Sequence, residues 1–395
     1  MLARRIMKCA GRRGGDTLAD VLAKGGSGEF YAGTAPGFAP WVKTALPWGS
    51  TYEPVFFPQD GVFVLAGDAP AGSSFRITQN LVDYDYKLGR WVHSPTVPSW
   101  VYLSGCLFVL IGGTLYRLSG ENWETEEVVW SQSLLPGGYL TLGSAGNALY
   151  IIGDRNTEDI DDQVLVRSTD LGKTWSSITP PQGAVLFTSI AVRGQYRGRL
   201  RENGGKAYSL VDAFWPKDGG GYSNGLRLWG GGASWADLTP SGWAVDGNGL
   251  LPSVICPHAG VVVALIMAEM TDGAAAITPP RFAVRGAGGA WSTVLLGLEG
   301  VLGELPAGTF WVPDAPVWPD WWTGTDTGHP FRIEPVGDAI HCTARFRGWD
   351  GSDYTADVGY AHGWSEDGAT WTWEAFTPDE NDQAWHFWAG RYDAS

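Results

Sequence analysis

A short turn that ends on tryptophan recurs along this chain and is the feature that most limits its fold. Each copy follows a strand-like run and places small or turn-forming residues directly before the tryptophan. Self-similarity of this kind is typical of proteins that stack one supersecondary unit many times. The six copies are Leu88–Trp91, Gly120–Trp123, Gly172–Trp175, Gly232–Trp235, Gly288–Trp291 and Gly368–Trp371.

The spacing of these turns fits four-stranded units. Successive tryptophans lie 32, 52, 60, 56 and 80 residues apart, and a four-stranded antiparallel unit needs about 40–50 residues. The runs between the turns are short, rich in β-branched and aromatic residues, and bounded by Gly, Asp or Asn. The sequence therefore predicts an all-β chain of six units. Five or seven are the alternatives, because the unit ending at Trp123 is short and the last is long.

Composition excludes several classes of function. The chain of 395 residues contains 22 Trp and 56 Gly, and disordered chains lack aromatic residues. Its formal net charge is −15, whereas a general nucleic-acid binder needs a basic face. No apolar run reaches the roughly 18 residues that a membrane helix requires. We therefore expect neither nucleic-acid binding nor membrane insertion.

Two of the six turns carry a sharper motif. Ser168–Trp175 follows the pattern S-x-D-x-G-x-T-W, and Ser365–Trp371 is the same pattern shortened by one residue. In such a turn the aspartate accepts backbone N–H bonds, glycine adopts positive φ, and tryptophan folds back on the hairpin. We expect structural roles for Ser168, Asp170, Gly172, Trp175, Ser365, Asp367, Gly368 and Trp371.

These turns resemble the Asp-box, or BNR repeat, of the sialidase superfamily, and the resemblance covers roughly residues 50–390. It implies a six-bladed β-propeller whose Asp-boxes lie at the outer edge of the blades, away from the ligand. Gln383–Tyr392 is strand-like and would complete the first blade and close the ring. We therefore predict one propeller domain over residues 50–395.

Residues 1–49 are predicted to form a basic arm, a short helix and a lead-in to the propeller. The arm carries Arg4, Arg5, Arg12 and Arg13 but lacks the apolar core of a signal peptide. Asp16–Lys24 has apolar residues at helical spacing behind an aspartate cap, so a helix is expected there. The arm is either a solvated tail or a segment that docks on an acidic partner.

Sialidase chemistry is not predicted, although the resemblance implies where to look for it. Sialidases hold the substrate carboxylate with three arginines and use a Tyr–Glu nucleophile and an Asp acid/base. Phe75–Thr78 lacks the proline of the first arginine motif, and Phe331–Pro335 comes too late in the chain. Later arginines, none in a family context, are Arg227, Arg285, Arg345 and Arg347.

A tryptophan-rich stretch broken by prolines, Phe310–Trp322, is the candidate ligand-binding loop. Indole rings stack on the C–H faces of sugars, and carboxylates accept hydrogen bonds from sugar hydroxyls. Two carboxylates could also serve a glycosidase. The alternative is that the indoles fill space between blades. The candidate residues are Trp311, Asp314, Trp318, Asp320, Trp321 and Trp322.

Two charged stretches are further candidates. Asp154–Asp162 carries five acidic residues, which we interpret as a solvated hairpin, with Ca²⁺ binding as the alternative. A basic stretch at 193–206 is either a solvated hairpin or a contact with an acidic neighbouring subunit. The four cysteines and six histidines have no metal-site spacing, so no other cofactor is expected. The assembly-contact candidates here are Arg193, Arg197, Arg199 and Arg201.

Two hypotheses about function follow. The first is a non-enzymatic propeller that serves as a structural or binding component of a larger assembly, a phage tail or other virion part, with a glycan- or receptor-binding face. Four of the six turns are degenerate copies of the Asp-box, as expected of a propeller whose role is structural. No secretory signal is expected, so we predict location in a virion, and a cytoplasmic location is the alternative. The second is a sialidase-like glycoside hydrolase acting on surface glycans.

Overall fold

The computed structural model describes the chain in segments, and for the strands before residue 99 and the last strand it describes the backbone alone. The described residues are 18–24, 30–33, 42–44, 52–57, 62–69, 72–78, 84–91, 99–111, 113–120, 125–133, 139–154, 163–181, 186–189, 201–216, 222–313, 331–336, 339–375 and 386–393.

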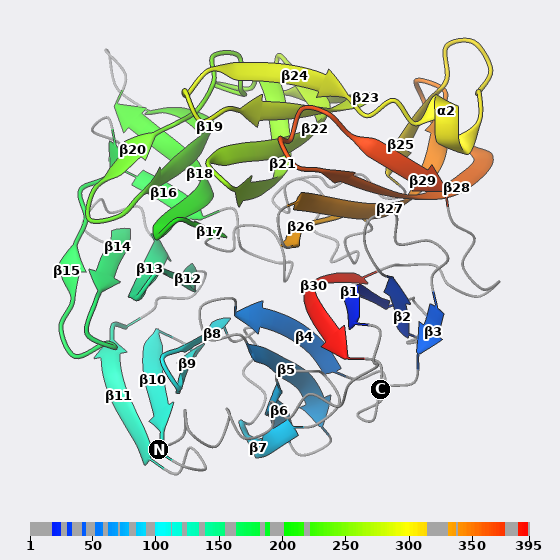
Figure 1. Ribbon diagram of the computed structural model, residues 1–395. Coiled ribbons are helices and arrows are strands. Elements are labelled where there is room, and N and C mark those ends of the chain that lie inside the picture. The colour runs from blue at the N-terminus through cyan, green and yellow to red at the C-terminus, as the bar shows by residue number, and fades with distance from the viewer. Residues whose placement is uncertain are drawn as a thin grey trace.

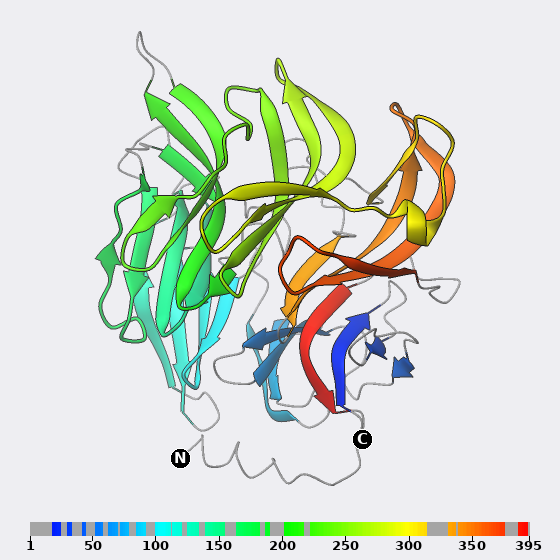
Figure 2. The ribbon, with the colours of Figure 1, turned by 45° about the horizontal axis from the view of Figure 1, so that its top comes forward.

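The strands in these segments form seven antiparallel sheets of four or five strands each, with one short helix. In most sheets, strands that follow one another in the chain pair side by side. Figures 1 and 2 show the sheets standing around a common centre. The fold is all-β and propeller-like. The sheets number one more than the tryptophan turns predict.

The first three sheets along the chain are β4–β7, β8–β11 and β12–β15. Sheet β4–β7 contains Tyr52–Phe57, Val62–Ala69, Gly72–Thr78 and Tyr84–Trp91. Sheet β8–β11 contains Ser99–Leu103, Cys106–Ile111, Thr114–Ser119 and Thr125–Ser131. Sheet β12–β15 contains Tyr139–Ala145, Ala148–Asp154, Gln163–Ser168 and Ser176–Ser177.

The next three sheets are β16–β20, β21–β24 and β25–β29. Sheet β16–β20 contains Leu186–Ser189, Arg201–Asn203, Lys206–Pro216, Tyr222–Gly231 and Trp235–Asp237. Sheet β21–β24 contains Gly249–His258, Val261–Thr271, Ala274–Arg285 and Trp291–Leu295, and helix α2, Glu299–Leu302, follows it. Sheet β25–β29 contains Phe310–Pro313, Arg332–Val336, Ala339–Trp349, Tyr354–Ser365 and Thr372–Ala375.

The seventh sheet, here called the closing sheet, joins the two ends of the chain. In it β1 (Leu18–Lys24) pairs with β30 (His386–Asp393) on one side and with β2 (Phe30–Gly33) on the other, and β3 (Val42–Thr44) lies beyond β2. Figure 1 shows β30 in red beside β1 in blue. A strand was expected at Gln383–Tyr392, but its partner is β1 and not a strand of sheet β4–β7.

The predicted helix at Asp16–Lys24 is wrong, because Leu18–Lys24 is strand β1. The apolar residues of this segment fit the helical period, but a strand also accommodates its β-branched and apolar side chains. Backbone pairing on both sides, Leu22 with Ala32 and with Trp388, overrides the local preference. The segment that follows the basic arm is therefore part of a sheet. The arm itself lies outside the described residues, and the domain boundary at residue 50 stays a prediction.

Five of the six predicted turn segments fall between the last two strands of a sheet, as their spacing suggests. The exception is Leu88–Trp91, which lies inside β7. Wherever side chains are described at these turns, the tryptophan packs on the preceding sheet. Trp175 donates from Nε1 to the Val129 carbonyl of β11 at 3.1 Å, and the Trp235 ring lies 6.0 Å from that of Tyr150 in β13.

The next two turns repeat this contact between sheets. Trp291 donates from Nε1 to the Leu238 carbonyl, just after β20, at 3.0 Å. The Trp371 ring stacks on Phe282 of β23, with ring centroids 4.3 Å apart and planes 23° apart. Such aromatic pairs add about 0.5–1.5 kcal/mol beyond the area they bury. The tryptophan thus fastens one sheet to another as well as folding over its own turn.

Glycine is needed in the two sharper turns for two reasons. Gly172 and Gly368 have φ of +84° and +72°, a region that costs other residues strain. A Cβ at Gly172 would lie 2.9 Å from Val129 Cγ2, and one at Gly368 would lie 2.6 Å from Val263 Cγ2. Both valines belong to the preceding sheet, so the glycine also permits the close approach of neighbouring sheets.

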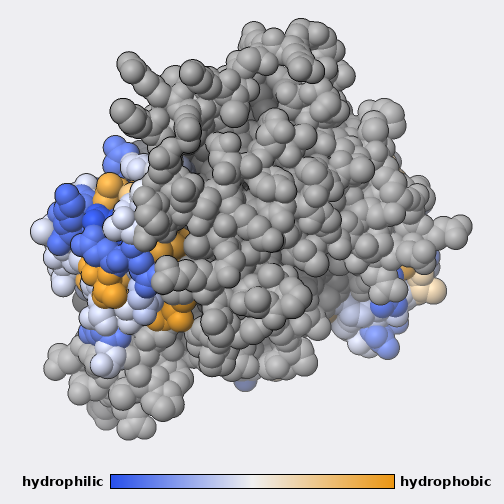
Figure 3. All heavy atoms as spheres, turned by 90° about the horizontal axis from the view of Figure 1, so that it is seen from below, coloured by the Kyte–Doolittle hydropathy of each residue, from blue (hydrophilic) through white to orange (hydrophobic). Residues whose placement is uncertain are grey.

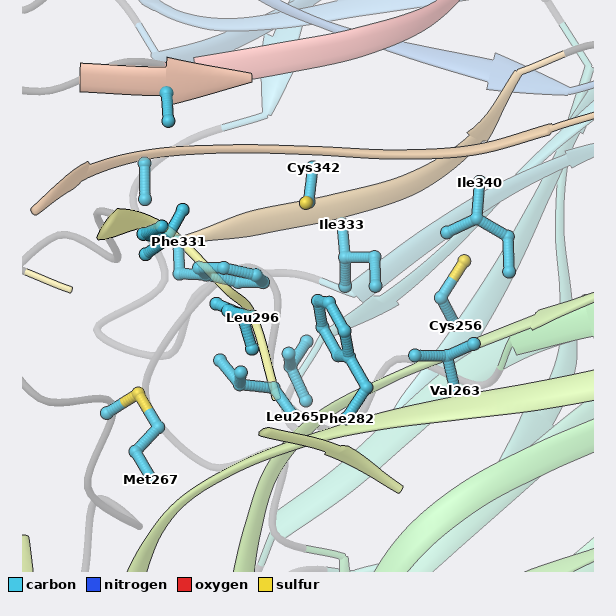
Figure 4. Close-up of a cluster of buried hydrophobic side chains, with 14 of the residues drawn as sticks. Cys256, Val263, Leu265, Met267, Phe282, Leu296, Phe331, Ile333, Ile340 and Cys342 are labelled. Carbon is cyan, nitrogen blue, oxygen red and sulfur yellow. The ribbon is translucent and has the colours of Figure 1, made fainter. Parts of the chain in front are cut away.

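Apolar clusters fill the described seams between consecutive sheets from β8 to β29. The cluster between sheets β21–β24 and β25–β29 contains Cys256, Phe282 and Cys342, all fully buried (Figure 4). Core positions were predicted for these two cysteines and for Cys106, which is only partly buried. Cys9 lies outside the described residues.

The outermost strand of sheet β8–β11 is exposed. Glu126, Glu127 and Val128 all face solvent, and Arg117 forms an ion pair with Glu127. Figure 3 views the molecule from below, and the described surface on the side of β11 and β15 mixes hydrophilic with hydrophobic side chains. Charged residues on an edge strand oppose pairing with another chain.

The Gly368→Ala substitution tests the fit of the turn against the preceding sheet. Strain at positive φ costs about 1–2 kcal/mol, and the clash with Val263 adds about 1–3 kcal/mol. Gly351→Ala is the matched control, because Gly351 has φ of +98° and open space around its Cα. Denaturant unfolding should show the larger loss for Gly368→Ala. Equal losses would mean that the contact between the sheets contributes nothing.

Candidate functional site

Trp311 is the one ligand-binding candidate whose side chain is described, and it lies in the core. It is 5% exposed, belongs to the apolar cluster beside sheet β21–β24, and donates from Nε1 to the Gly303 carbonyl at 2.9 Å. Its role is therefore packing between sheets, the alternative that the sequence left open. The other candidates lie outside the described residues, namely Asp314, Trp318, Asp320, Trp321 and Trp322.

The tryptophan-rich and basic stretches interrupt equivalent strands of two sheets. Residues 314–330 separate β25 from β26, and both strands pair with β27. Residues 190–200 separate β16 from β17, and both pair with β18. Strand β21 contacts β17 on one side and β26 on the other. The strands that follow the two stretches thus flank β21.

Most charged candidates belong to segments outside the described residues. Arg193, Arg197 and Arg199 lie outside the described residues, and Arg201 begins β17 with only its backbone described. The acidic stretch lies outside as well, apart from Asp154, which ends β13.

Sheet β25–β29 has one apolar and one polar face. Alternate residues of β27, such as Ile340 and Phe346, enter the cluster shared with sheet β21–β24, and those between them take the opposite face. The buried described residues on that opposite face are His341, Thr343 and His362, together with Val312 at its outer end, opposite Arg347. We call this the polar face, formed by His341, Thr343, Arg345, Arg347, Tyr360, His362, Trp364 and Glu374.

Two histidines and a glutamate form a hydrogen-bonded chain across three strands of the polar face. His341 Nδ1 in β27 lies 3.1 Å from His362 Nε2 in β28, and His362 Nδ1 lies 2.9 Å from Glu374 Oε1 in β29. The imidazole planes differ by 4° and the ring centroids are 5.3 Å apart. With nitrogens only 3.1 Å apart, this centroid distance means that the rings lie edge to edge, nearly in one plane.

The partners fix the protons of the chain. An ionised carboxylate only accepts hydrogen bonds, so His362 donates from Nδ1 to Glu374, and its neutral Nε2 accepts from His341 Nδ1–H. Burial lowers the pKa of both histidines to about 3, and for His341 the charges of His362 and His258 add to the effect. Both imidazoles are therefore neutral near pH 7. The chain can pass a proton along its length or stay locked with both imidazoles neutral.

Two arginines on the same face rest on tyrosines of their own sheet. Arg345 Cζ lies 6.0 Å from the centre of the Tyr360 ring, and Arg347 Cζ lies 4.9 Å from that of Tyr354. Arg347 also donates from Nη2 to the Thr355 carbonyl at 2.9 Å. Each cation–π contact contributes about 0.5–1 kcal/mol at a partly exposed site.

The arginines considered for sialidase chemistry are spread over several sheets. Arg227 in β19 pairs with Asp237, Nε to Oδ2 at 3.5 Å, whereas Arg285 lies in β23. Arg345 and Arg347 lie in β27, one sheet further along. Arg76 of the first motif lies in β6, where only the backbone is described. The described contacts of Arg227, Arg345 and Arg347 all lie within their own sheets.

The two sharper turns are held by their aspartates. Asp170 accepts from the Thr174 hydroxyl at 2.6 Å, the Thr174 amide at 2.9 Å and the Ser168 hydroxyl at 2.8 Å. Asp367 accepts from the Thr370 amide at 2.7 Å and from its hydroxyl at 3.1 Å. The Thr174 hydroxyl is the main cause that lowers the pKa of Asp170 to about 2, and the Thr370 amide lowers that of Asp367. The carboxylates of Asp170 and Asp367 therefore stabilise the two sharper turns.

Sequence reasoning missed the Glu374–His362–His341 chain. Its histidines are 21 residues apart and the glutamate follows after 12 more, so no local motif joins them. Their contact depends on the register of the long hairpin β27–β28, which shifts between Arg347 and Trp349. The available signal was the alternation of polar and apolar residues along β27, which marks a polar face.

Metal binding finds no support in the described part of the chain, where no three His, Cys, Asp or Glu side chains are placed to hold an ion. His362 uses opposite ring nitrogens for Glu374 and His341, so these three groups cannot converge on one centre. The same segments contain no helix that is both long and apolar enough to cross a membrane.

Comparison with known proteins assigns no family. No family model and no curated protein matches this chain. Among solved structures, the periplasmic gluconolactonase of Pseudomonas aeruginosa is 13% identical over 92% of this chain and 100% of its own, with a TM-score of 0.35. Sucrose-6-phosphate hydrolase from Lactobacillus gasseri is 10% identical over 83% and 86%, with a TM-score of 0.31. At these values the likenesses assign neither an activity nor a ligand.

The Asp170→Asn substitution tests the role of the turn carboxylate. Because the pKa of Asp170 is about 2 and that of an ordinary aspartate 3.8, the charged form stabilises the fold above pH 3.8, and this stabilisation is lost as the pH falls toward 2. The variant should unfold at lower urea at pH 7 and lose less stability below pH 4. Asp272→Asn, at another exposed turn, is the control. Identical pH dependence in variant and wild type would contradict this role.

Proposed function

We propose that the seven sheets are the blades of one closed propeller and that this protein is a non-enzymatic binding or structural component of a larger assembly. On this view the turns Ser168–Trp175 and Ser365–Trp371 are Asp-boxes that hold the outer ends of their blades. The observation that carries the proposal is the placement of the two long stretches 190–200 and 314–330 in equivalent strands.

Repetition of the strand order brings the first residues of β17 and β26, Arg201 and Arg332, to one end of the ring. Strands β17, β21 and β26 contact one another in that order. Strand β21 is the first strand of its sheet, and β17 and β26 are parts of the interrupted first strands of theirs. In a propeller, first strands all run in the same direction relative to the axis. The chain therefore enters β17 and β26 at the same end. Ligands of propellers and barrels bind at such an end, where loops from several sheets meet.

The residue types of the two stretches suit a glycan or a glycosylated receptor. Trp318, Trp321 and Trp322 offer indole faces for sugar rings, and Asp314 and Asp320 offer acceptors for hydroxyls. The arginines of the basic stretch would contact an acidic surface of a neighbouring subunit. A phage tail or another virion part, which must both join an assembly and meet a cell surface, combines these two requirements.

A glycan-binding measurement tests the proposal. The purified chain should bind a subset of bacterial surface glycans or sialosides without turnover, and Trp321→Ala should weaken binding about 5- to 150-fold if a sugar ring stacks on the indole as strongly as a base does, with about 1–3 kcal/mol. Val128→Ala, an exposed position on β11, is the control and should change nothing.

Turnover of the glycan would overturn the non-enzymatic assignment. If it disappears in Asp314→Ala or Asp320→Ala, the protein is a glycoside hydrolase that uses these carboxylates. If purified virions contain no copy of the chain, the placement in a virion is refuted, whatever the glycan result.

A further inference from the structure

The seam between sheet β25–β29 and the closing sheet differs from the described seams before it. Strand β30 contacts β26 and β27, and Figure 1 shows it beside them. The polar face, which looks away from the apolar cluster, is the face of sheet β25–β29 on this side. Three of its four buried described residues are polar, namely His341, Thr343 and His362, and the fourth is Val312, whereas the four seams from β8 to β29 are filled by apolar clusters.

We propose that the buried, coplanar His341–His362 pair is an acid-sensitive latch at the seam with the closing sheet, so that acidification toward pH 5 makes β30 and β1 open more often while the other sheets stay folded.

Adding a proton to the pair removes the hydrogen bond between the two histidines. The His362 Nε2 accepts from His341 Nδ1–H only while it carries no proton. A proton on that nitrogen turns the acceptor into a donor, so two N–H groups face each other and the bond is lost. The new charge would also lie on a ring that is fully buried, and burying a charge is costly.

The direction of the pH effect follows from the same burial. The pKa of both histidines is about 3 in the fold and 6.5 in a solvated chain. Their contribution to stability is therefore complete above pH 6.5 and is lost as the pH falls from 6.5 toward 3. The aspartates of the two sharper turns, Asp170 and Asp367, act only below about pH 3.8. Between pH 6.5 and 4.5 the histidine pair therefore changes the stability of the fold, whereas the two aspartates do not.

Other charged groups surround the pair. Glu374 lies at one end of the chain and offsets one positive charge, and Arg345 and Arg347 lie on the same face, each against a tyrosine ring. The charged and titratable residues carried by the strands packed around the pair are His258 on β21, Arg332 and Glu334 on β26, Glu374 on β29, and His386, Arg391 and Asp393 on β30.

Hydrogen exchange of the whole chain, followed by mass spectrometry at pH 7, 6 and 5, tests the latch. Rates are corrected for the pH dependence of unprotected amides. Peptides from β30 and β1 should exchange at least about 25-fold faster at pH 5 than at pH 7, the factor for one histidine titrating at 6.5 only in the open state. Peptides from β22, which is buried along most of its length, are the internal reference and should keep their protection.

The variants His341→Gln and His362→Gln keep a hydrogen-bonding side chain but do not titrate. Each should reduce the pH dependence of exchange in β30, and the double variant should abolish it. Should these variants fail to fold, histidine C2–H exchange in the wild type measures both pKa values directly. Parallel opening of β22 and β30, unchanged pH dependence in the double variant, or a His362 pKa near 6.5 would each overturn the proposal.

Discussion

The fit of each outer turn against the preceding sheet is the contact on which the rest of this structure depends. A tryptophan ring or its Nε1 reaches the neighbouring sheet at four successive turns, ending at Trp175, Trp235, Trp291 and Trp371. In two of them a glycine also lies against a valine of that sheet. These contacts set the spacing at the outer rim, and the apolar clusters fill the space within it. Neighbouring sheets are therefore held together both at their outer turns and by the apolar core between them.

The polar face of sheet β25–β29 is the exception to this scheme, and its position is informative. Apolar packing tolerates many arrangements of about the right volume, whereas a chain of hydrogen bonds such as Glu374–His362–His341 requires one arrangement of three strands. The face lies where the chain must bring together segments from its two ends. The directional hydrogen bonds of this network favour one register of the three strands. They also make the seam sensitive to pH.

The sequence predicted the local features of this fold better than its closure. The turn Ser168–Trp175 could be identified because every contact in it, from Asp170 to Thr174, is made within eight residues. The strand Leu18–Lys24 was mistaken for a helix because its partners lie elsewhere in the chain. The seventh sheet escaped the count for the same reason. The sequence between its strands β2 and β3 does end on a tryptophan, Trp41, but prolines replace the small-residue pattern.

The candidate site was predictable only where its residues are neighbours in sequence. The alternation along β27 indicated two faces, but the meeting of His341 with His362 depends on the exact register of a hairpin of more than twenty residues. Trp311 shows the opposite error, since composition marked it as a ligand contact and burial makes it part of the core. Residue type alone does not distinguish an indole that stacks on a ligand from one that fills a seam.

The closing sheet also sets an order of events during synthesis. Strand β1 leaves the ribosome well before β30, so Lys24 must wait for His386, about 360 residues later, before its free edge is paired. This pairing has the largest loop-closure entropy among the described strand pairs, so it should form last and slowly. Until then β1 exposes a β-edge on which another chain could pair. The free edge of β1 therefore persists until β30 has been synthesised.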